Sequence, residues 1–324
     1  MVAQAPHTFT IFPSRTSTFA SLRPSTLIEG SFPPLGFIAG QNEGPRHQGF
    51  PPIRRPCMEA TSIGRTGLRR PMTKRAMITG ASAGIGEATA RALAKRGYAL
   101  TLLARRAERL DALADELAAA HSTKSEVVPV DLRDARALTV LHAAHPDLFG
   151  DVDVLVNNAG LAKGTEPLQD GNPDEWDEVI DTNVKSLLRV TRLVLPGMIR
   201  RGAGHVVMLG STAGHWVYPG GAVYCASKHA VRAITEGLRM DVHGTGVRVT
   251  SVDPGLVGGT EFSDVRFRGD HERARTVYKG LQPLTPEDVA ETIAWCVERP
   301  PHVNVQDLVI MPTAQASVTM VKKA

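Results

Sequence analysis

The sequence predicts an α/β protein, a single domain of about 250 residues with a doubly wound, seven-stranded parallel sheet and helices on both faces. Three observations support this fold class. From Arg75 onward, short β-branched runs alternate with amphipathic helical stretches, which is typical of β-α-β units. The runs are almost continuously apolar, as expected for strands buried on both faces. Turns rich in glycine and small polar residues follow several runs, at the strand ends where such sheets bind ligands.

The predicted elements follow one another without an internal repeat or a low-complexity block. The strands are Ala76–Thr79, Ala99–Leu103, Glu126–Val130, Val152–Val156, His205–Leu209, Arg248–Val252 and Asp307–Met311. Helical periodicity predicts helices between them, including Gly84–Arg96, Glu108–Ala120, Trp176–Arg200, Ala222–His243 and Pro286–Val297. One domain over residues 72–324 accounts for the whole series.

The first 71 residues differ in composition from the rest. They hold ten of the 22 prolines, and their apolar residues follow neither a strand nor a helix period. The net charge of +4 also originates near this end: residues 1–75 carry ten Lys and Arg against three Glu, and the remainder carries 27 basic against 30 acidic residues. Three interpretations stay open, namely translation from Met72, a disordered tail or a targeting segment. We expect a disordered or non-native extension.

Composition excludes several classes of protein. Hydrophobic residues are 42% and charged residues 22%, which is typical of a globular chain. Three cysteines without a C-x-x-C motif exclude a disulfide framework and a cysteine-based zinc site. No apolar run reaches the ~18–20 residues of a membrane span, and the basic N-terminal segment lacks the aromatic interleaving of a nucleic-acid-binding arm. We expect a cytoplasmic protein with no metal, membrane or nucleic-acid partner.

The turn after the first predicted strand suits a phosphate group. Residues 79–86 read T-G-A-S-A-G-I-G and open the first predicted helix. Glycines let the backbone turn sharply, and the N–H groups at a helix start attract a pyrophosphate. An ordinary strand-helix turn is the alternative, but the position in the first β-α unit favours a dinucleotide. The candidates for cofactor binding here are Thr79, Gly80, Ser82, Gly84, Ile85 and Gly86.

Arg105 and Arg106 follow the second predicted strand, where an NAD-binding protein usually carries an acidic residue for the ribose hydroxyl. Their charge suits a 2′-phosphate instead, and the arginine fork can bind it through two hydrogen bonds. A solvated helix start is the alternative interpretation. The sequence therefore favours NADP(H) as the cofactor.

Further cofactor candidates follow the third and fourth strands. Asp131 is placed to accept a hydrogen bond from an adenine amino group, and the N-N-A-G sequence over residues 157–160 leaves room for the adenine ribose. Such residues also fill ordinary turns, but their positions at successive strand ends favour a binding role. The candidates are Asp131, Leu132, Asn158, Ala159 and Gly160.

Tyr224 and Lys228 are four residues apart, and therefore on one face of the predicted helix. Free tyrosine titrates near pH 10, and a neighbouring ammonium is expected to lower this pKa and make the phenol a usable acid/base. A surface pair is the alternative interpretation. Ser211, thirteen residues before Tyr224 at the end of the fifth strand, adds a hydroxyl and favours a catalytic site.

These motifs together resemble the short-chain dehydrogenases/reductases. T-G-x-x-x-G-x-G, N-N-A-G, Asn183, Ser211 and Y-x-x-x-K occur in order over residues 75–311. The resemblance implies a Rossmann fold in which Tyr224 donates and accepts the proton and Ser211 binds the substrate oxygen. It also implies that Lys228 holds the nicotinamide ribose and that Asn183 supports a water that relays protons to Lys228.

The same resemblance implies further cofactor contacts for Tyr224, Lys228, Pro254, Gly255 and Val257, the last three in the stretch that covers the nicotinamide. The family's usual threonine follows the proline by five residues, whereas here Thr260 follows by six. The long run P-G-L-V-G-G-T-E-F is similar to one branch, the NADP-dependent 3-hydroxy acid dehydrogenases, and accounts for this displacement.

This branch implies substrates such as L-serine, L-allo-threonine, 3-hydroxyisobutyrate and 3-hydroxypropionate. A carboxylate substrate needs a cation near the reacting carbon, so we hypothesise that Arg266 pairs with it, with a surface role as the alternative. His215, Trp216 and Tyr218 follow Ser211 and are candidates for the pocket wall. His205, His215, His229 and His243 are interpreted as structural or surface residues, and Cys225 as a packing residue.

Two other functions stay open. Another reductase of the family, acting on a ketoacyl thioester or a xenobiotic ketone, would share every catalytic residue and differ in its pocket. A non-catalytic NADP(H)-binding regulator would not need Asn183, Ser211, Tyr224 and Lys228 together. The resemblance also implies a homotetramer or homodimer that pairs the predicted helices Trp176–Arg200 and Ala222–His243.

Overall fold

Residues 73–324, which are those described by the computed structural model, build one parallel sheet of seven strands in the order β3-β2-β1-β4-β5-β6-β7. The strands are β1 (Arg75–Thr79), β2 (Ala99–Ala104), β3 (Ser125–Pro129), β4 (Val154–Asn157), β5 (Gly204–Leu209), β6 (Val247–Pro254) and β7 (Asp307–Ile310). The predicted doubly wound Rossmann sheet is thereby confirmed. The predictions for residues 1–71 and for a start at Met72 lie outside the described residues.

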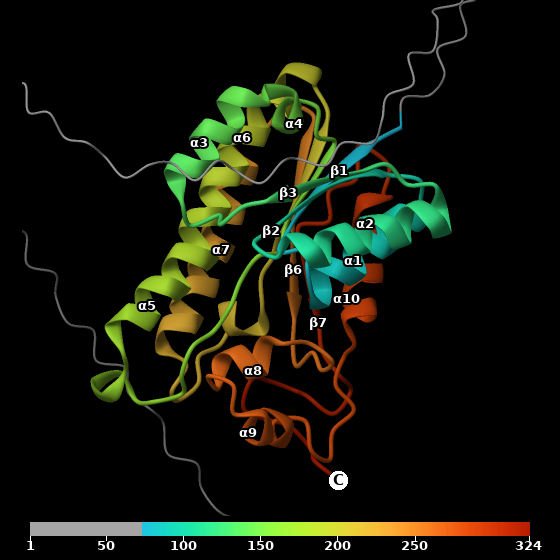
Figure 1. The fold of residues 1–324 in the computed structure, drawn as a ribbon. Coiled ribbons are helices and arrows are strands. Elements are labelled where there is room, and N and C mark those ends of the chain that lie inside the picture. Colours follow the sequence, from blue (N-terminus) through green and yellow to red (C-terminus); the bar gives the residue numbers. More distant parts are fainter. Residues whose placement is uncertain (1–72) are drawn as a thin grey trace, which may run out of the picture. The chain divides into compact units, whose positions relative to one another are not determined.

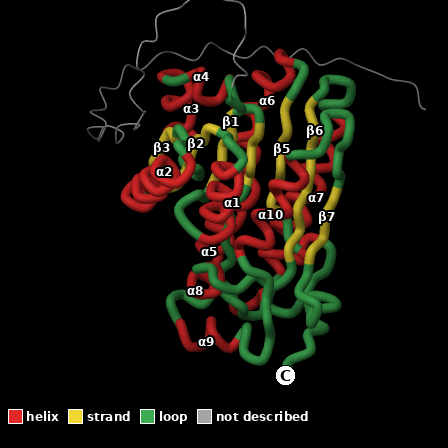
Figure 2. Tube along the Cα trace, turned by 90° about the vertical axis from the view of Figure 1, so that its right-hand side faces the viewer, coloured by secondary structure: helices red, strands yellow, loops and turns green. Residues whose placement is uncertain are grey.

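Helices cover both faces of this sheet (Figure 1). On one face lie α1 (Gly84–Lys95), α2 (Ala107–His121) and α10 (Pro286–Val297). On the other lie α3 (Ala135–Ala144), α4 (Pro146–Gly150), α5 (Pro173–Ile180), α6 (Ser186–Arg201) and α7 (Ala222–Asp241). Two short helices, α8 (Phe262–Arg266) and α9 (His271–Thr276), lie beyond the carboxyl ends of the strands, as Figure 2 also shows. No helix within residues 73–324 has the length and apolar character needed to cross a membrane.

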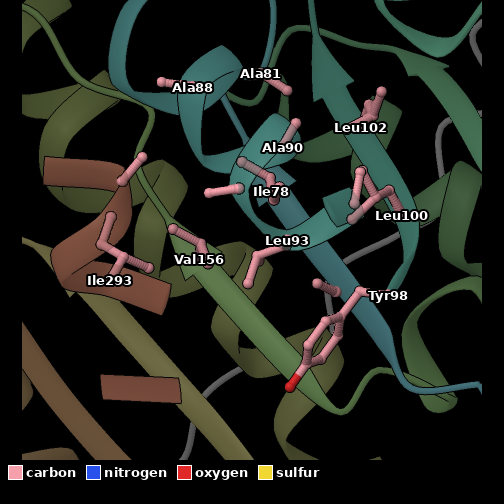
Figure 3. Close-up of a cluster of buried hydrophobic side chains, with 14 of the residues drawn as sticks. Ile78, Ala81, Ala88, Ala90, Leu93, Tyr98, Leu100, Leu102, Val156 and Ile293 are labelled. Atoms are coloured by element: carbon pink, nitrogen blue, oxygen red, sulfur yellow. The ribbon is translucent and has the colours of Figure 1, made fainter. Parts of the chain in front are cut away.

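The alternation of side chains along each strand divides the core into two clusters. On β1, Ala76 and Ile78 pack toward α1, α2 and α10, whereas Met77 packs toward α3, α4 and α6. Figure 3 shows the first cluster, with Leu93 of α1 lying against the strands. Because both faces are apolar, the polar ends of the strands are the parts of the sheet left to bind a ligand.

Most predicted bounds differ from the observed ones by one or two residues; the sixth strand, predicted over Arg248–Val252, is β6 over Val247–Pro254. The fourth strand is predicted over Val152–Val156, but β4 covers Val154–Asn157, and the Val152 carbonyl accepts a hydrogen bond from the Arg201 guanidinium. The helix expected over Trp176–Arg200 is α5 and α6, joined by a π-helical turn over Asp181–Lys185. Such a turn inserts a residue and is often found at functional sites.

Candidate active site

A cleft of about 450 Å³ opens at the carboxyl ends of the strands and gathers most of the predicted site residues. Its lining includes Gly80, Ser82, Gly84, Ile85, Arg105, Arg106, Asp131, Leu132, Asn158, Ala159, Gly160, Ser211, Tyr224, Lys228, Pro254, Gly255, Val257 and Arg266. Thr79, Gly86 and Asn183 are not among the lining residues and lie behind the cleft wall. The structure therefore brings most of the predicted site residues together in one cleft and places three of them in the layer behind it.

The glycine-rich turn is shaped by backbone conformation and by close packing. Gly80 and Gly84 have φ values of 68° and 55°, in the left-handed region that favours glycine. A Cβ on Gly86 would lie 2.4 Å from Nδ2 of Asn158, so only glycine fits there. The Thr79 hydroxyl accepts hydrogen bonds from the N–H groups of Asn158 and Ala159, which ties this turn to the one after β4. Thr79 and Gly86 thus support the turn from behind.

The start of α1 is open to an anion. Ala83 precedes the helix in extended conformation and provides no side-chain cap, so the first N–H groups of α1 face the turn uncapped by that residue. Thr260 packs its methyl group on this turn, 3.2 Å from where a Cβ on Gly84 would lie. Thr260 therefore lies against the glycine-rich turn even though it follows Pro254 by six residues.

The predicted 2′-phosphate site contains a carboxylate that sequence reasoning did not single out. Arg106 donates hydrogen bonds to Oγ of Ser82 at 3.1 Å and to Glu261 at 2.8 Å, and Arg109 donates to Glu261 at 2.7 Å. Arg105 lines the cleft beside them and is exposed. A sequence signal existed, because Glu261 belongs to the P-G-L-V-G-G-T-E-F run.

Asp131 lines the cleft as an ionised carboxylate. Its carboxylate accepts hydrogen bonds from the backbone N–H of Arg133 at 3.0 Å and from the guanidinium at 2.7 Å. These bonds hold the pKa of Asp131 below its ordinary value, so the group is ionised at neutral pH. An ionised carboxylate can accept a further hydrogen bond, as the predicted contact with an adenine amino group requires.

Asn183 sits in the π-helical turn and is almost fully buried. Its Oδ1 accepts from the N–H of Leu161, and its Nδ2 donates to the Leu161 carbonyl, each at 2.8 Å, and to Oγ of Ser227 at 3.0 Å. The side chain therefore joins the loop after β4 to α7. Gly160 fits between Asn183 and Lys228, since a Cβ there would lie 3.2 Å from Oδ1 and 3.7 Å from Nζ.

Tyr224 and Lys228 face the cleft from α7, and Ser211 reaches it from the end of β5. Nζ of Lys228 donates to the Leu209 carbonyl at 2.8 Å and lies 6.0 Å from the centre of the Tyr224 ring. Burial raises the pKa of Tyr224 above its ordinary value, while the hydrogen bond with Ser211 and the charge of Arg266 act to lower it. Burial also lowers the pKa of Lys228 to about 8.

The pKa of Tyr224 shifts in the direction opposite to the one predicted from the sequence, which expects the neighbouring ammonium of Lys228 to lower it. In the structure the cost of burying a phenolate outweighs the favourable contacts, so the net direction is upward. The phenol is therefore protonated at neutral pH. This is the state of a proton donor.

The far end of the cleft is formed by α8 and by the segment after Ser211. Phe262 packs edge-on against the Tyr224 ring, with 5.5 Å between ring centres. Nη1 of Arg266 donates to the Tyr218 hydroxyl at 3.1 Å, and Nε donates to the Gly164 carbonyl at 3.3 Å. Of the three candidates for the pocket wall, Tyr218 lines the cleft, whereas His215 pairs with Asp253 and Trp216 is exposed.

The other histidines and the cysteine interpreted from the sequence, His205, His229, His243 and Cys225, lie outside the cleft lining. His205 is buried in β5, His229 bonds to the Cys225 carbonyl, and His243 is exposed after α7. Cys225 is fully buried beside Tyr224, as expected of a packing residue. Within residues 73–324, no three His, Cys, Asp or Glu side chains come together as a metal site would require.

Comparison with known proteins gives consistent matches over the described region. Residues 74–270 match the family model described as short chain dehydrogenase. An NADP-dependent 3-hydroxy acid dehydrogenase of Salmonella typhi is 48% identical over 240 residues, which cover 74% of this chain and 95% of that protein. A serine 3-dehydrogenase of Agrobacterium fabrum is 45% identical over 240 residues, or 74% of this chain and 94% of that protein.

Solved structures agree with these sequence matches. The closed form of a serine dehydrogenase complexed with NADP⁺ superposes with a TM-score of 0.72 at 44% identity, covering 77% of this chain and 99% of that one. Serine dehydrogenase from Escherichia coli gives a TM-score of 0.64 at 41% identity, over 75% of this chain and 99% of that one.

Proposed function

The chain belongs to the short-chain dehydrogenase family and is an NADP(H)-dependent oxidoreductase acting on CH–OH groups, and we propose that its substrates are small 3-hydroxy acids. The observation that carries the proposal is the position of Arg266, whose guanidinium lines the same cleft as Ser211 and Tyr224. The relatives named for 3-hydroxy acids and serine support it. L-Serine, L-allo-threonine, 3-hydroxyisobutyrate and 3-hydroxypropionate represent this substrate class.

The cleft has the features that NADP(H) requires. The turn at Gly80 and Gly84 admits a pyrophosphate, and the start of α1 offers N–H groups to it. Arg105 and Arg106 line the same cleft, and we assign their guanidinium groups to the 2′-phosphate. NADP(H), when bound, supplies or accepts the hydride.

The chain's own residues supply the proton chemistry. In carbonyl reduction, the neutral phenol of Tyr224 donates its proton to the substrate oxygen, and the Ser211 hydroxyl donates a hydrogen bond to that oxygen. The Lys228 ammonium favours the phenolate that this transfer leaves behind. Oxidation of the hydroxy acid uses the same groups in reverse, with the phenolate as the base.

Asn183 keeps these groups aligned from behind the cleft. It joins Leu161 to α7, the helix that carries Tyr224 and Lys228. As the family resemblance implies, we propose that Asn183 positions a water molecule that relays protons to Lys228. Its burial makes it a support for the site rather than a contact for the substrate.

The substrate carboxylate is assigned to Arg266. Arg266 is half-buried. Its guanidinium donates one hydrogen bond to the Tyr218 hydroxyl and one to the Gly164 carbonyl, so N–H donors remain for a carboxylate. A bidentate or charge-assisted contact of this kind discriminates strongly against a neutral alcohol, which would leave the cation unpaired.

One assay tests the substrate class. NADP⁺ reduction is measured with the four hydroxy acids named above and with a simple secondary alcohol, using Tyr224→Phe as the control for catalysis. Activity on the acids that Tyr224→Phe lowers by roughly 10²- to 10⁴-fold supports the proposal. Activity confined to the alcohol, or to ketoacyl thioesters or xenobiotic ketones in the reverse direction, overturns it. Tight NADPH binding without turnover indicates a regulator instead.

We also propose that the chain forms a homotetramer or homodimer and resides in the cytoplasm. The family resemblance, which pairs the helices that are α6 and α7 here, supports self-association, and both helices carry exposed apolar side chains, namely Leu188, Ile199 and Met240. Two buried free cysteines, Cys225 and Cys296, suit a reducing compartment. Light scattering coupled to size-exclusion chromatography tests the first point, and a monomer at micromolar concentration contradicts it.

A further inference from the structure

Asp253 is a buried carboxylate beneath the active site to which the mechanism above assigns no role. It occupies the carboxyl end of β6 and is 2% exposed. Oδ1 accepts a hydrogen bond from Oγ of Ser251 at 2.6 Å, and Oδ2 lies 2.7 Å from Nε2 of His215. Burying a carboxylate is costly unless hydrogen bonds and a positive charge compensate it, so a compensating cation is expected nearby.

Besides His215, the cationic side chain of Lys228 lies close to this carboxylate, because both groups contact the end of β5. A Cβ on Gly210 would lie 1.7 Å from Oδ1 of Asp253, so the carboxylate lies directly against the end of β5. The preceding carbonyl, that of Leu209, accepts the hydrogen bond from Nζ of Lys228. The ammonium and the carboxylate therefore contact consecutive residues of the chain, Leu209 and Gly210.

We propose that Asp253 is a positioning residue of the active site, whose carboxylate charge keeps Lys228 in its cationic form beside Tyr224. The inference rests on the proposed function of Tyr224 and Lys228. It requires no new reaction step, because Asp253 acts through Lys228 and does not touch the substrate.

The charges around Lys228 agree with this role. Its own helix brings Tyr224, the π-helical turn brings the neutral amide of Asn183, and β6 brings Asp253 with His215 behind it. Asp181 and Lys185 of the π-helical turn pair with each other at 2.6 Å. Burial lowers the pKa of Lys228, and the negative charge of Asp253 acts in the opposite direction. Without it, Lys228 would lose its proton closer to neutral pH.

The test is the pH profile of carbonyl reduction by NADPH, measured as kcat from pH 6 to 10 for wild type, Asp253→Asn and His215→Asn. Asp253→Asn removes the carboxylate charge and keeps the shape of the side chain. His215→Asn removes the hydrogen-bonding ring and keeps the carboxylate charge of Asp253. We expect Asp253→Asn to move the alkaline fall in rate down by about one pH unit, and His215→Asn to leave it within a few tenths. Equal profiles for Asp253→Asn and wild type overturn the proposal.

If Asp253→Asn does not fold, Asp253→Ser provides the neutral variant. The wild-type pH profile is a second test, because a fall in rate centred below pH 7 contradicts a Lys228 that Asp253 keeps cationic. The substrate is any carbonyl compound that the wild-type protein reduces. Failure on 3-oxo acids therefore removes the proposed substrate class, while a shifted profile on another carbonyl still supports the role of Asp253.

Discussion

The hydroxyl of Tyr218 lies 3.1 Å from Nη1 of Arg266, and the same guanidinium lies 5.2 Å from the centre of the Tyr218 ring. The two residues come from segments 48 positions apart in the chain. The ring and its hydroxyl hold the arginine on the wall that also carries Tyr224 and Phe262. We expect this cation to be the group that binds the carboxylate of a substrate acid.

Replacing Arg266 with alanine is expected to raise the KM for 3-hydroxy acids by roughly 30- to 150-fold. The loss corresponds to about 2 to 3 kcal/mol for a charge-assisted contact. Steady-state kinetics with 3-hydroxypropionate and with a simple secondary alcohol provide the measurement. Arg275→Ala, an exposed arginine of α9 outside the cleft lining, is the matched control. An unchanged KM for the acid in Arg266→Ala would falsify the assignment.

Replacing Arg105 with alanine is expected to weaken NADPH binding about 10- to 100-fold and to leave NADH binding nearly unchanged. The physical reason is that NADPH carries the 2′-phosphate that this guanidinium is assigned to bind, whereas NADH lacks it. Fluorescence titration with both cofactors measures the two dissociation constants. Arg91→Ala on the exposed face of α1, where Arg91 pairs with Glu87 and Glu116, is the control. Equal losses for both cofactors contradict a phosphate role.

Replacing Asn183 with alanine is expected to lower the free energy of unfolding by about 2 to 4 kcal/mol. The change leaves the N–H and carbonyl of Leu161 without their partner in a buried site. Urea unfolding measures the effect. Asn172→Ala, at the exposed start of α5, removes a cap worth about 1 kcal/mol and serves as the comparison. If both variants lose the same small amount, Asn183 does not brace the site.

His205 is expected to make the fold sensitive to acid. Its Nε2 bonds to Oγ1 of Thr250, its Nδ1 has no partner among the described residues, and burial lowers its pKa to about 3. The unfolded chain therefore binds more protons between pH 3 and 6.5, so the free energy of unfolding falls as pH falls through this window. Between pH 7 and 5 the contribution of this group is about 2 kcal/mol.

The variant His205→Gln keeps a donor for Thr250 and removes the titrating ring. Thr250 donates to the Val305 carbonyl, so its hydroxyl accepts from residue 205. The loss of stability between pH 7 and 5, measured by urea unfolding, is expected to shrink by about 2 kcal/mol relative to wild type. His243→Gln, at an exposed position, is expected to behave as wild type. Identical pH dependence in all three proteins would exclude the effect.

Local patterns were enough to predict the strands and most of the cleft. Apolar runs and glycine spacing depend on neighbours a few residues away, which is why β1, α1 and the turn at Gly80 agree closely with the structure. The π-helical turn at Asn183 was not predictable in this way. It follows from a fit between distant segments, in which Asn183 must reach Leu161 and Ser227 together.

The sequence by itself determined the fold class, the edge of the sheet at which a ligand would bind and most of the residues that meet there. Only the tertiary structure decided the order of the strands, which residues line the cleft, that Glu261 joins Arg106 and Arg109, and that Asp253 and Lys228 contact neighbouring residues at the end of β5. It also decided that the pKa of Tyr224 is raised and not lowered. Sequence motifs and their spacing show which chemical groups are available, whereas burial and contacts between distant segments set the charge and the partners of those groups.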